Sequence, residues 1–276
     1  MRGSRSSSPL GSSAPERRER APAWIAVLAA LGAAFFIVPL IGLVARTPWG
    51  DALGSLTAPD TIEALKLSLI ASLSSTAVAL VLGVPLAWMY ARIEFPGRTV
   101  LRALTTLPMV LPPVVGGIAL LLAFGRRGLV GAWLDSAFGI TLPFSTAGVV
   151  FAETFVAMPF LVLTVEAGLR SMDRRYEEAA RALGARRWTV FSRVTLPLIA
   201  PSLAAGAVLC WARALGEFGA TITFAGNFPG VTQTMPLAVY LLLESNPRGS
   251  FVLSLILLLV SLAVLVGLRH RWLGSA

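Results

Sequence analysis

The amino-acid sequence predicts an all-α membrane protein that crosses the bilayer six times. Of the 276 residues, 56% are apolar and only 13% are charged, whereas soluble domains have about 45–50% and about 25%. Apolar stretches of roughly 20 residues, enough for a helix to span a bilayer, recur along the whole chain. With a mean hydropathy of +0.77, these observations exclude an ordinary soluble enzyme.

The first half of the chain contains a polar tail and three predicted spans. Residues 1–20 are rich in Ser, Gly, Pro and Arg, so we expect a disordered cytoplasmic tail. A first span at about 24–45 is longer than the apolar region of a cleavable signal peptide and should be retained. A second span follows at about 61–90. A third, at about 101–124, is interrupted by three prolines and two glycines.

The second half contains three further spans, at about 146–169, 198–224 and 250–268. Polar segments at 125–145 and 225–249 are expected to be loops. We therefore interpret residues 21–276 as one transmembrane domain.

The distribution of basic residues sets the predicted orientation. With the N-terminus inside, the four cytoplasmic segments hold 17 of the 23 basic residues. This distribution follows the positive-inside rule and places both termini in the cytoplasm of a multi-pass protein of the cell membrane. The high net charge of +9 is therefore a signal of topology, and nucleic acid is not an expected partner.

The longest charged stretch outside the tail, residues 170–196, predicts a short cytoplasmic helix at about 173–190. Glu177 and Arg181 form an (i, i+4) pair on it, and Gly184 either turns the chain or lets another backbone approach. Its small, alanine-rich apolar face suits docking on a protein better than lying on the bilayer.

The same stretch resembles the EAA–G–(I/V)-x-L-P signature of ABC importer permeases at every position. This resemblance implies the type I importer permease fold, and it identifies the helix at 173–190 as the coupling helix, which inserts into the ATPase subunit. It further implies a homodimer, a cytoplasmic ATPase dimer that holds ATP and Mg, and an extracytoplasmic oxyanion-binding protein. The residues assigned to ATPase coupling are Glu178, Ala179, Ala180, Gly184, Val194, Leu196 and Pro197.

Two further stretches resemble molybdate permeases in particular. Residues 107–117 are similar to the third span of that family, and residues 213–227 are similar to its fifth. The resemblance implies import of molybdate, with tungstate as a related substrate. Sulfate/thiosulfate permeases carry a related G-E-(F/Y)-G motif and are the alternative.

Candidate residues of the transport pathway lie in the third and fifth spans. Prolines in the third span form either a fixed kink or a hinge. In the fifth span, Arg213 and Glu217 lie one turn apart and form either a structural ion pair or an outer gate. Gly216 and Ala220 there predict a face for close helix contact. The full set of candidates is Pro112, Gly116, Arg213, Gly216, Glu217, Thr221 and Thr223.

Other classes of protein fit the sequence poorly. The only lysine, Lys66, does not follow a glycine-rich loop, so this chain is not expected to be the ATPase. One Cys and one His provide no metal cluster, and we expect no cofactor on this chain. An ion-coupled secondary transporter remains a remote alternative, since such proteins place several acidic groups near mid-membrane. Glu153, near the start of the fourth span, is expected to be solvated.

Overall fold

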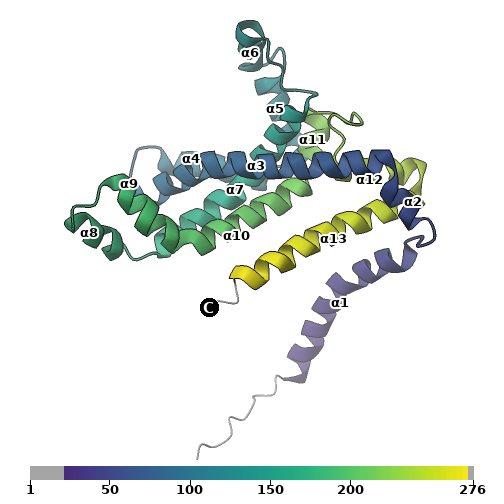
Figure 1. Ribbon diagram of the computed structural model, residues 1–276, viewed down its shortest axis with the longest axis horizontal. Coiled ribbons are helices and arrows are strands. Elements are labelled where there is room, and N and C mark those ends of the chain that lie inside the picture. Colours follow the sequence, from purple (N-terminus) through teal and green to yellow (C-terminus); the bar gives the residue numbers. More distant parts are fainter. Residues whose placement is uncertain (1–21, 273–276) are drawn as a thin grey trace, which may run out of the picture. The chain divides into compact units, whose positions relative to one another are not determined.

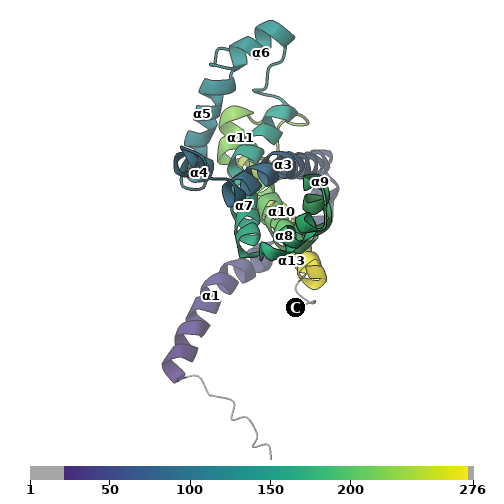
Figure 2. The ribbon, with the colours of Figure 1, turned by 90° about the vertical axis from the view of Figure 1, so that its left-hand side faces the viewer.

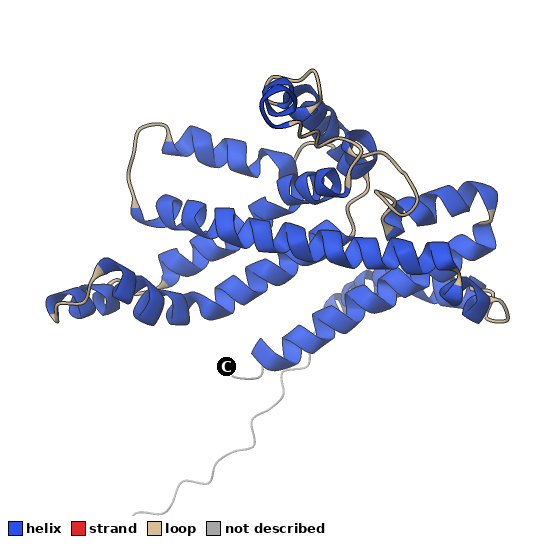
Figure 3. Cartoon of the chain, turned by 45° about the horizontal axis from the view of Figure 1, so that its top comes forward, coloured by secondary structure: helices blue, strands red, loops and turns tan. Residues whose placement is uncertain are grey.

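The computed structural model describes residues 22–272, in which helices are the only regular secondary structure (Figure 3). The predicted tail at 1–20 lies outside the described residues. In chain order the helices are α1 (Ala23–Arg46), α2 (Ala52–Thr57), α3 (Pro59–Arg92), α4 (Arg98–Thr106), η1 (Leu107–Met109), α5 (Pro113–Phe124), α6 (Gly131–Phe138), α7 (Thr146–Ser171), α8 (Arg175–Ala182), α9 (Arg187–Val190), η2 (Phe191–Thr195), α10 (Leu196–Leu215), α11 (Gly219–Phe224), α12 (Met235–Ser245) and α13 (Pro247–Trp272).

Helix α1 belongs to a unit of its own, and the chain from Thr47 onward forms a second unit. Helix α1 contains no buried residue. Its 24 residues extend roughly 36 Å at 1.5 Å per residue, enough to cross a hydrocarbon layer of about 30 Å.

Helices α3, α7 and α10 form the core of the second unit (Figure 1). Small residues let them approach closely. A Cβ atom on Gly83 of α3 would lie 3.2 Å from Val162 of α7, and one on Gly206 of α10 would lie 3.1 Å from Leu161. Such contacts stabilise helix pairs in membranes, where hydrophobic burial contributes little.

In the described part of the chain, five helices are long and apolar enough to cross a membrane, and a bent pair provides a sixth candidate. The bent pair corresponds to the predicted third span. Its halves, Arg98–Met109 and Pro113–Phe124, meet at 119°, because Pro112 and Pro113 cannot donate the hydrogen bonds that would continue the first half. Figures 1 and 2 show α5 and α6 extending away from the core, with α11 beside α5.

Three details of the predicted topology are wrong. The fifth span is not one helix over 198–224, because α10 ends at Leu215 and α11 begins at Gly219. The segments 125–145 and 225–249, expected to be loops, contain α6 and α12. These helices are short, at 8 and 11 residues, so the prediction, which sought apolar runs of spanning length, overlooked them.

Candidate functional site

The predicted coupling helix is shorter than expected. Instead of one helix over 173–190, the structure has α8, a turn and then α9. Gly184 ends α8 in the left-handed conformation, with φ +84°, and the amide of Ala185 donates to the carbonyl of Ala180 at 3.0 Å. A Cβ on Gly184 would meet no atom within 4 Å. The glycine is therefore required by the backbone turn and not by close packing within this chain.

Glu177 is the carboxylate that joins α8 to the rest of the chain. Its side chain is 7% exposed, and its oxygens lie 3.3 Å from Nη2 of Arg92 and 3.4 Å from Nη2 of Arg181. The hydroxyl of Thr195 donates to Oε1 of Glu177 at 2.7 Å. Three elements, α3, α8 and the segment before α10, thus meet at one carboxylate.

The neighbouring Glu178, which the signature selects, is exposed on α8, as is Ala179, and Ala180 is half-buried. The sequence contained the (i, i+4) pair of Glu177 with Arg181 but gave no sign of Arg92, which lies 85 residues earlier. Exposure leaves Glu178 and Ala179 available to a partner protein, while Glu177 fixes the helix that presents them.

The second half of the signature lies in a widened helical turn. Residues Phe191–Thr195 form a π-helix, in which the amide of Leu196 donates to the carbonyl of Phe191. Pro197 has no N–H and its ring crowds the carbonyl four residues earlier, which favours such a turn. Val194 and Leu196 are half-buried and Pro197 is exposed. The turn directs Thr195 toward Glu177.

Arg213 and Glu217 form an ion pair at the break between α10 and α11. Nη1 of Arg213 lies 2.6 Å from Oε2 of Glu217, and the side chains are 29% and 1% exposed. Oε1 of Glu217 accepts a hydrogen bond of 2.8 Å from the amide of Ala220. The glutamate therefore both neutralises the arginine and satisfies a free amide in the first turn of α11.

The helix break also corrects the prediction of a small-residue face. Gly216 caps α10 while Ala220 lies in α11, so the two residues do not share one helical face. The close contact is made by Gly117 instead. A Cβ at that position would lie 2.7 Å from Cβ of Thr223 and 2.9 Å from the carbonyl of Ala220, so α5 packs directly on α11.

The remaining pathway candidates are largely engaged within the chain. The carbonyl of Pro112 accepts hydrogen bonds from the amides of Val115 and Gly116. The hydroxyl of Thr223 donates to the carbonyl of Gly219 at 2.7 Å. Thr221 is 0% exposed, and its hydroxyl has no hydrogen-bond partner among the described residues. In this conformation Thr221 does not face open space.

Two buried acidic residues were not recognised as such from the sequence. Glu153 is 1% exposed, so the expectation of a solvated side chain was wrong. Glu166, also 1% exposed, lies 3.1 Å from Arg102 of α4 and 2.7 Å from Arg170. The Glu166–Arg170 pair has helical spacing and could have been found, whereas Arg102 is brought in by the tertiary fold. Among the side chains that the structure describes, no three His, Cys, Asp or Glu are placed to share a metal ion.

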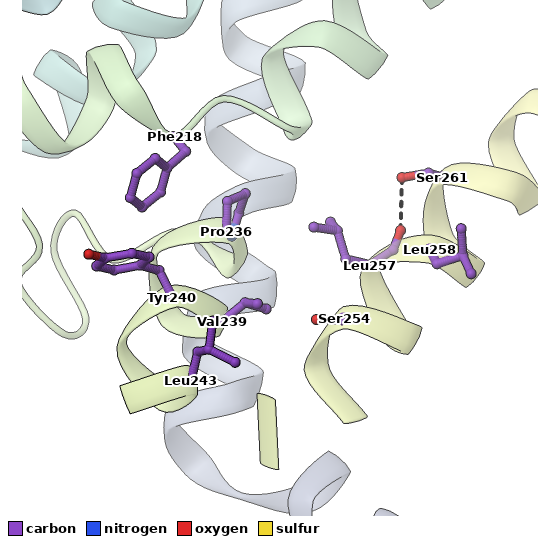
Figure 4. Close-up of a pocket in the computed structure, with 9 residues that line it drawn as sticks. All are labelled: Phe218, Pro236, Val239, Tyr240, Leu243, Ser254, Leu257, Leu258 and Ser261. Atoms are coloured by element: carbon purple, nitrogen blue, oxygen red, sulfur yellow. Dashed lines mark hydrogen bonds between the residues drawn. The ribbon is translucent and has the colours of Figure 1, made fainter. Parts of the chain in front are cut away.

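A groove of about 480 Å³ lies between α12 and α13, next to Phe218 (Figure 4). None of the described residues that line it is charged. Its two serines, Ser254 and Ser261, donate to carbonyls of their own helix at 2.8 Å. The groove therefore suits an apolar group and not an oxyanion.

Comparison with known proteins places these features in a family. The family model described as "Binding-protein-dependent transport system inner membrane component" matches residues 79–275. The chain belongs to this family. The molybdenum transport system permease protein ModB of Mycobacterium bovis is 47% identical over 252 residues, covering 91% of this chain and 94% of that protein. The sulfate transport system permease protein CysT of Escherichia coli is 38% identical over 226 residues, covering 80% and 81%.

The fold agrees with this assignment. A crystal structure of a bacterial ABC transporter involved in the import of the polysaccharide alginate matches with a TM-score of 0.69 at 20% identity, covering 90% of this chain and 94% of that one. The predicted all-α fold of a type I ABC importer permease is thereby confirmed. The chain is a multi-pass inner-membrane permease component of an ABC importer.

Proposed function

We propose that this chain is the permease subunit of a molybdate importer, with tungstate as a related substrate. The observation that carries the proposal is the 47% identity to a molybdenum permease over 91% of the chain, against 38% over 80% for a sulfate permease. Because this chain is also similar to a sulfate permease, sulfate is the alternative substrate.

The proposed topology places both termini and the α8–α9 segment in the cytoplasm. Support comes from the basic residues, 17 of which fall on the cytoplasmic side in this orientation, as the positive-inside rule expects. Cysteine-accessibility labelling at Val130 and Ala185 tests it, since position 130 should react from outside and position 185 only after permeabilisation. Equal labelling of both from outside would contradict the orientation.

The proposed assembly is a homodimer with a cytoplasmic ATPase dimer and an extracytoplasmic oxyanion-binding protein. ATP and Mg are held by the ATPase, and this chain is not expected to bind a cofactor. Coupling would proceed through Glu178, Ala179 and the turn at Gly184, because these lie on the outside of the helix that Glu177 holds in place. ATP binding by the partner would close the cytoplasmic side and open the outer one.

The proposed pathway binds its substrate weakly. A molybdate dianion needs cations for tight binding, yet Arg213 is already paired with Glu217 at 2.6 Å. Selectivity would then reside in the binding protein, and residues such as Thr223 and Pro112 would provide only a polar passage. The isolated permease should accordingly show no micromolar molybdate binding by calorimetry, and tight binding would instead make Arg213 a substrate ligand.

The decisive experiment is uptake by proteoliposomes that contain the permease, its ATPase and the binding protein. We expect ATP-dependent accumulation of labelled molybdate that excess tungstate suppresses and excess sulfate does not. Accumulation of labelled sulfate at the same rate would favour the sulfate alternative. Uptake driven by an ion gradient without ATP would contradict the proposal.

A further inference from the structure

A cavity of about 780 Å³ separates the last turns of α3 from the segment that contains α8, α9 and the π-helical turn. It is distinct from the ion pair at Arg213, and its lining includes two exposed residues of α8, Glu178 and Arg181. Its wall carries more positive than negative charge, with four arginines against two glutamates. These six residues are Arg92, Arg174, Arg181, Arg187, Glu177 and Glu178.

The lining changes in character along α3. Pro85, Trp88 and Arg92 line the cavity from one face of this helix, three and four residues apart. From Pro85 to Arg92 the helix advances roughly 10 Å at 1.5 Å per residue, so an apolar wall gives way to a cationic one toward the end of α3. In the orientation proposed above, on which this inference rests, that end is cytoplasmic.

The arginines retain unused donors. Glu177 is shared between Arg92 and Arg181, at 3.3 and 3.4 Å. Arg92 is 8% exposed, and its Nε is buried without a hydrogen-bond partner among residues 22–272. Among the described residues, Nη2 of Arg174 donates to the carbonyl of Ala91 at 3.3 Å. A guanidinium has five N–H donors. Arg174, Arg181 and Arg187 line the cavity and are exposed, so their remaining donors are available to an anionic ligand there.

We propose that this cavity binds the headgroup of an anionic phospholipid from the inner leaflet. Arginine forks match phosphate oxygens in geometry and charge, and basic pockets beside spanning helices on the cytoplasmic side bind such headgroups. The apolar wall formed by Pro85 and Trp88, with Phe191 opposite, accommodates the start of an acyl chain. A free oxyanion has the same charge chemistry but leaves this apolar wall empty.

The site has a structural consequence for coupling. The cavity is lined on one side by α3 and on the other by α8, α9 and the π turn. A phosphate held between Arg92 and Arg187 bridges these two walls. The lipid thus adds to the Glu177 contacts that hold the coupling segment against the spanning core.

The test uses the full-length permease in nanodiscs of phosphatidylcholine with a graded fraction of phosphatidylglycerol. Native mass spectrometry after gentle detergent release measures retained phosphatidylglycerol. Removing two basic residues at an anionic lipid site, in the variant Arg174→Gln/Arg187→Gln, should weaken retention about 30-fold, equivalent to about 2 kcal/mol. Both side chains are exposed, so the variant should fold. Arg186→Gln/Arg193→Gln is the matched control, because both arginines are exposed in the same segment but do not line the cavity.

Equal loss of lipid from Arg186→Gln/Arg193→Gln would overturn the inference, because the attraction would then be general to the basic segment. Displacement of phosphatidylglycerol by millimolar inorganic phosphate would also overturn it, since a free oxyanion would then be the ligand. Molybdate uptake is measured separately. If uptake is normal but lipid retention does not depend on the site, only this inference is contradicted. If retention depends on the site but molybdate is not taken up, this inference is supported and the proposed substrate is contradicted.

Discussion

Replacing Glu177 should destabilise the permease far more than replacing its neighbour Glu178. Glu177→Ala leaves the guanidinium of Arg92, 8% exposed, without its carboxylate, and it removes the hydrogen bond from Thr195. Removing one partner of a buried ion pair costs about 3–5 kcal/mol. The N–O separations of 3.3 and 3.4 Å are longer than those of the strongest charge-assisted hydrogen bonds. We therefore expect a loss of stability at the lower end of this range, about 3 kcal/mol. Glu178→Ala, at an exposed position, should change stability by less than about 0.5 kcal/mol.

Thermal unfolding of the purified permease in one detergent provides the assay, and uptake per ATP hydrolysed provides the functional readout. Glu177→Gln retains an acceptor for Thr195 and should lose about half as much stability as the alanine variant. The double variant Arg92→Gln/Glu177→Gln should be more stable than the sum of the single changes predicts, because no buried charge remains unpaired. Equal destabilisation by the two alanine variants, or strict additivity in the double variant, would refute this account of Glu177.

Three other outcomes follow from the site geometry. Gly184→Trp should abolish uptake while ATP hydrolysis continues, because it strains a turn at φ +84° and adds bulk at the proposed contact with the ATPase. Normal uptake at normal expression would contradict the coupling assignment. Gly117→Ala should cost about 1–3 kcal/mol in thermal stability, since its Cβ would lie 2.7 Å from a side chain of α11. Gly216→Ala, whose nearest contact is 3.6 Å, should cost less. Arg213→Gln should destabilise the protein by about 3 kcal/mol by leaving Glu217 unpaired; a fully stable variant that loses uptake would make Arg213 a substrate ligand.

The pattern of the sequence was sufficient for the fold class and the family. The thickness of the bilayer sets the length of an apolar span, so apolar runs of that length predicted the fold class. The signature from Glu178 to Pro197 is a short sequence motif, and it predicted the family. The pair of Arg213 with Glu217 also follows from helical spacing. Each of these features depends on residues close together in the chain, where sequence alone carries the physical constraint.

Breaks within the spans were harder to predict. Prolines marked an irregularity in the third span, but the size of the bend, 119°, depends on where α5 packs against α11. No proline marks the end of α10 at Leu215. There the chain leaves the helix, and Glu217 satisfies both Arg213 and the amide of Ala220. Helical spacing predicts the first of these contacts but not the helix break that allows the second.

Length, hydrophobic pattern and charge distribution therefore determined that this chain is a helical membrane protein with a short charged helix between two spans, and the resemblance of that segment to a family signature indicated a permease. Only the tertiary structure decided which carboxylate of that helix is buried, because the partner of Glu177 is Arg92, 85 residues away. The burial of Glu153 and Glu166 was also decided only by the tertiary structure. The apolar pattern places both residues in a membrane span, but it does not show whether their side chains face water or lie in the core. Burial of a polar group depends on the groups that surround it, and those come from distant parts of the chain.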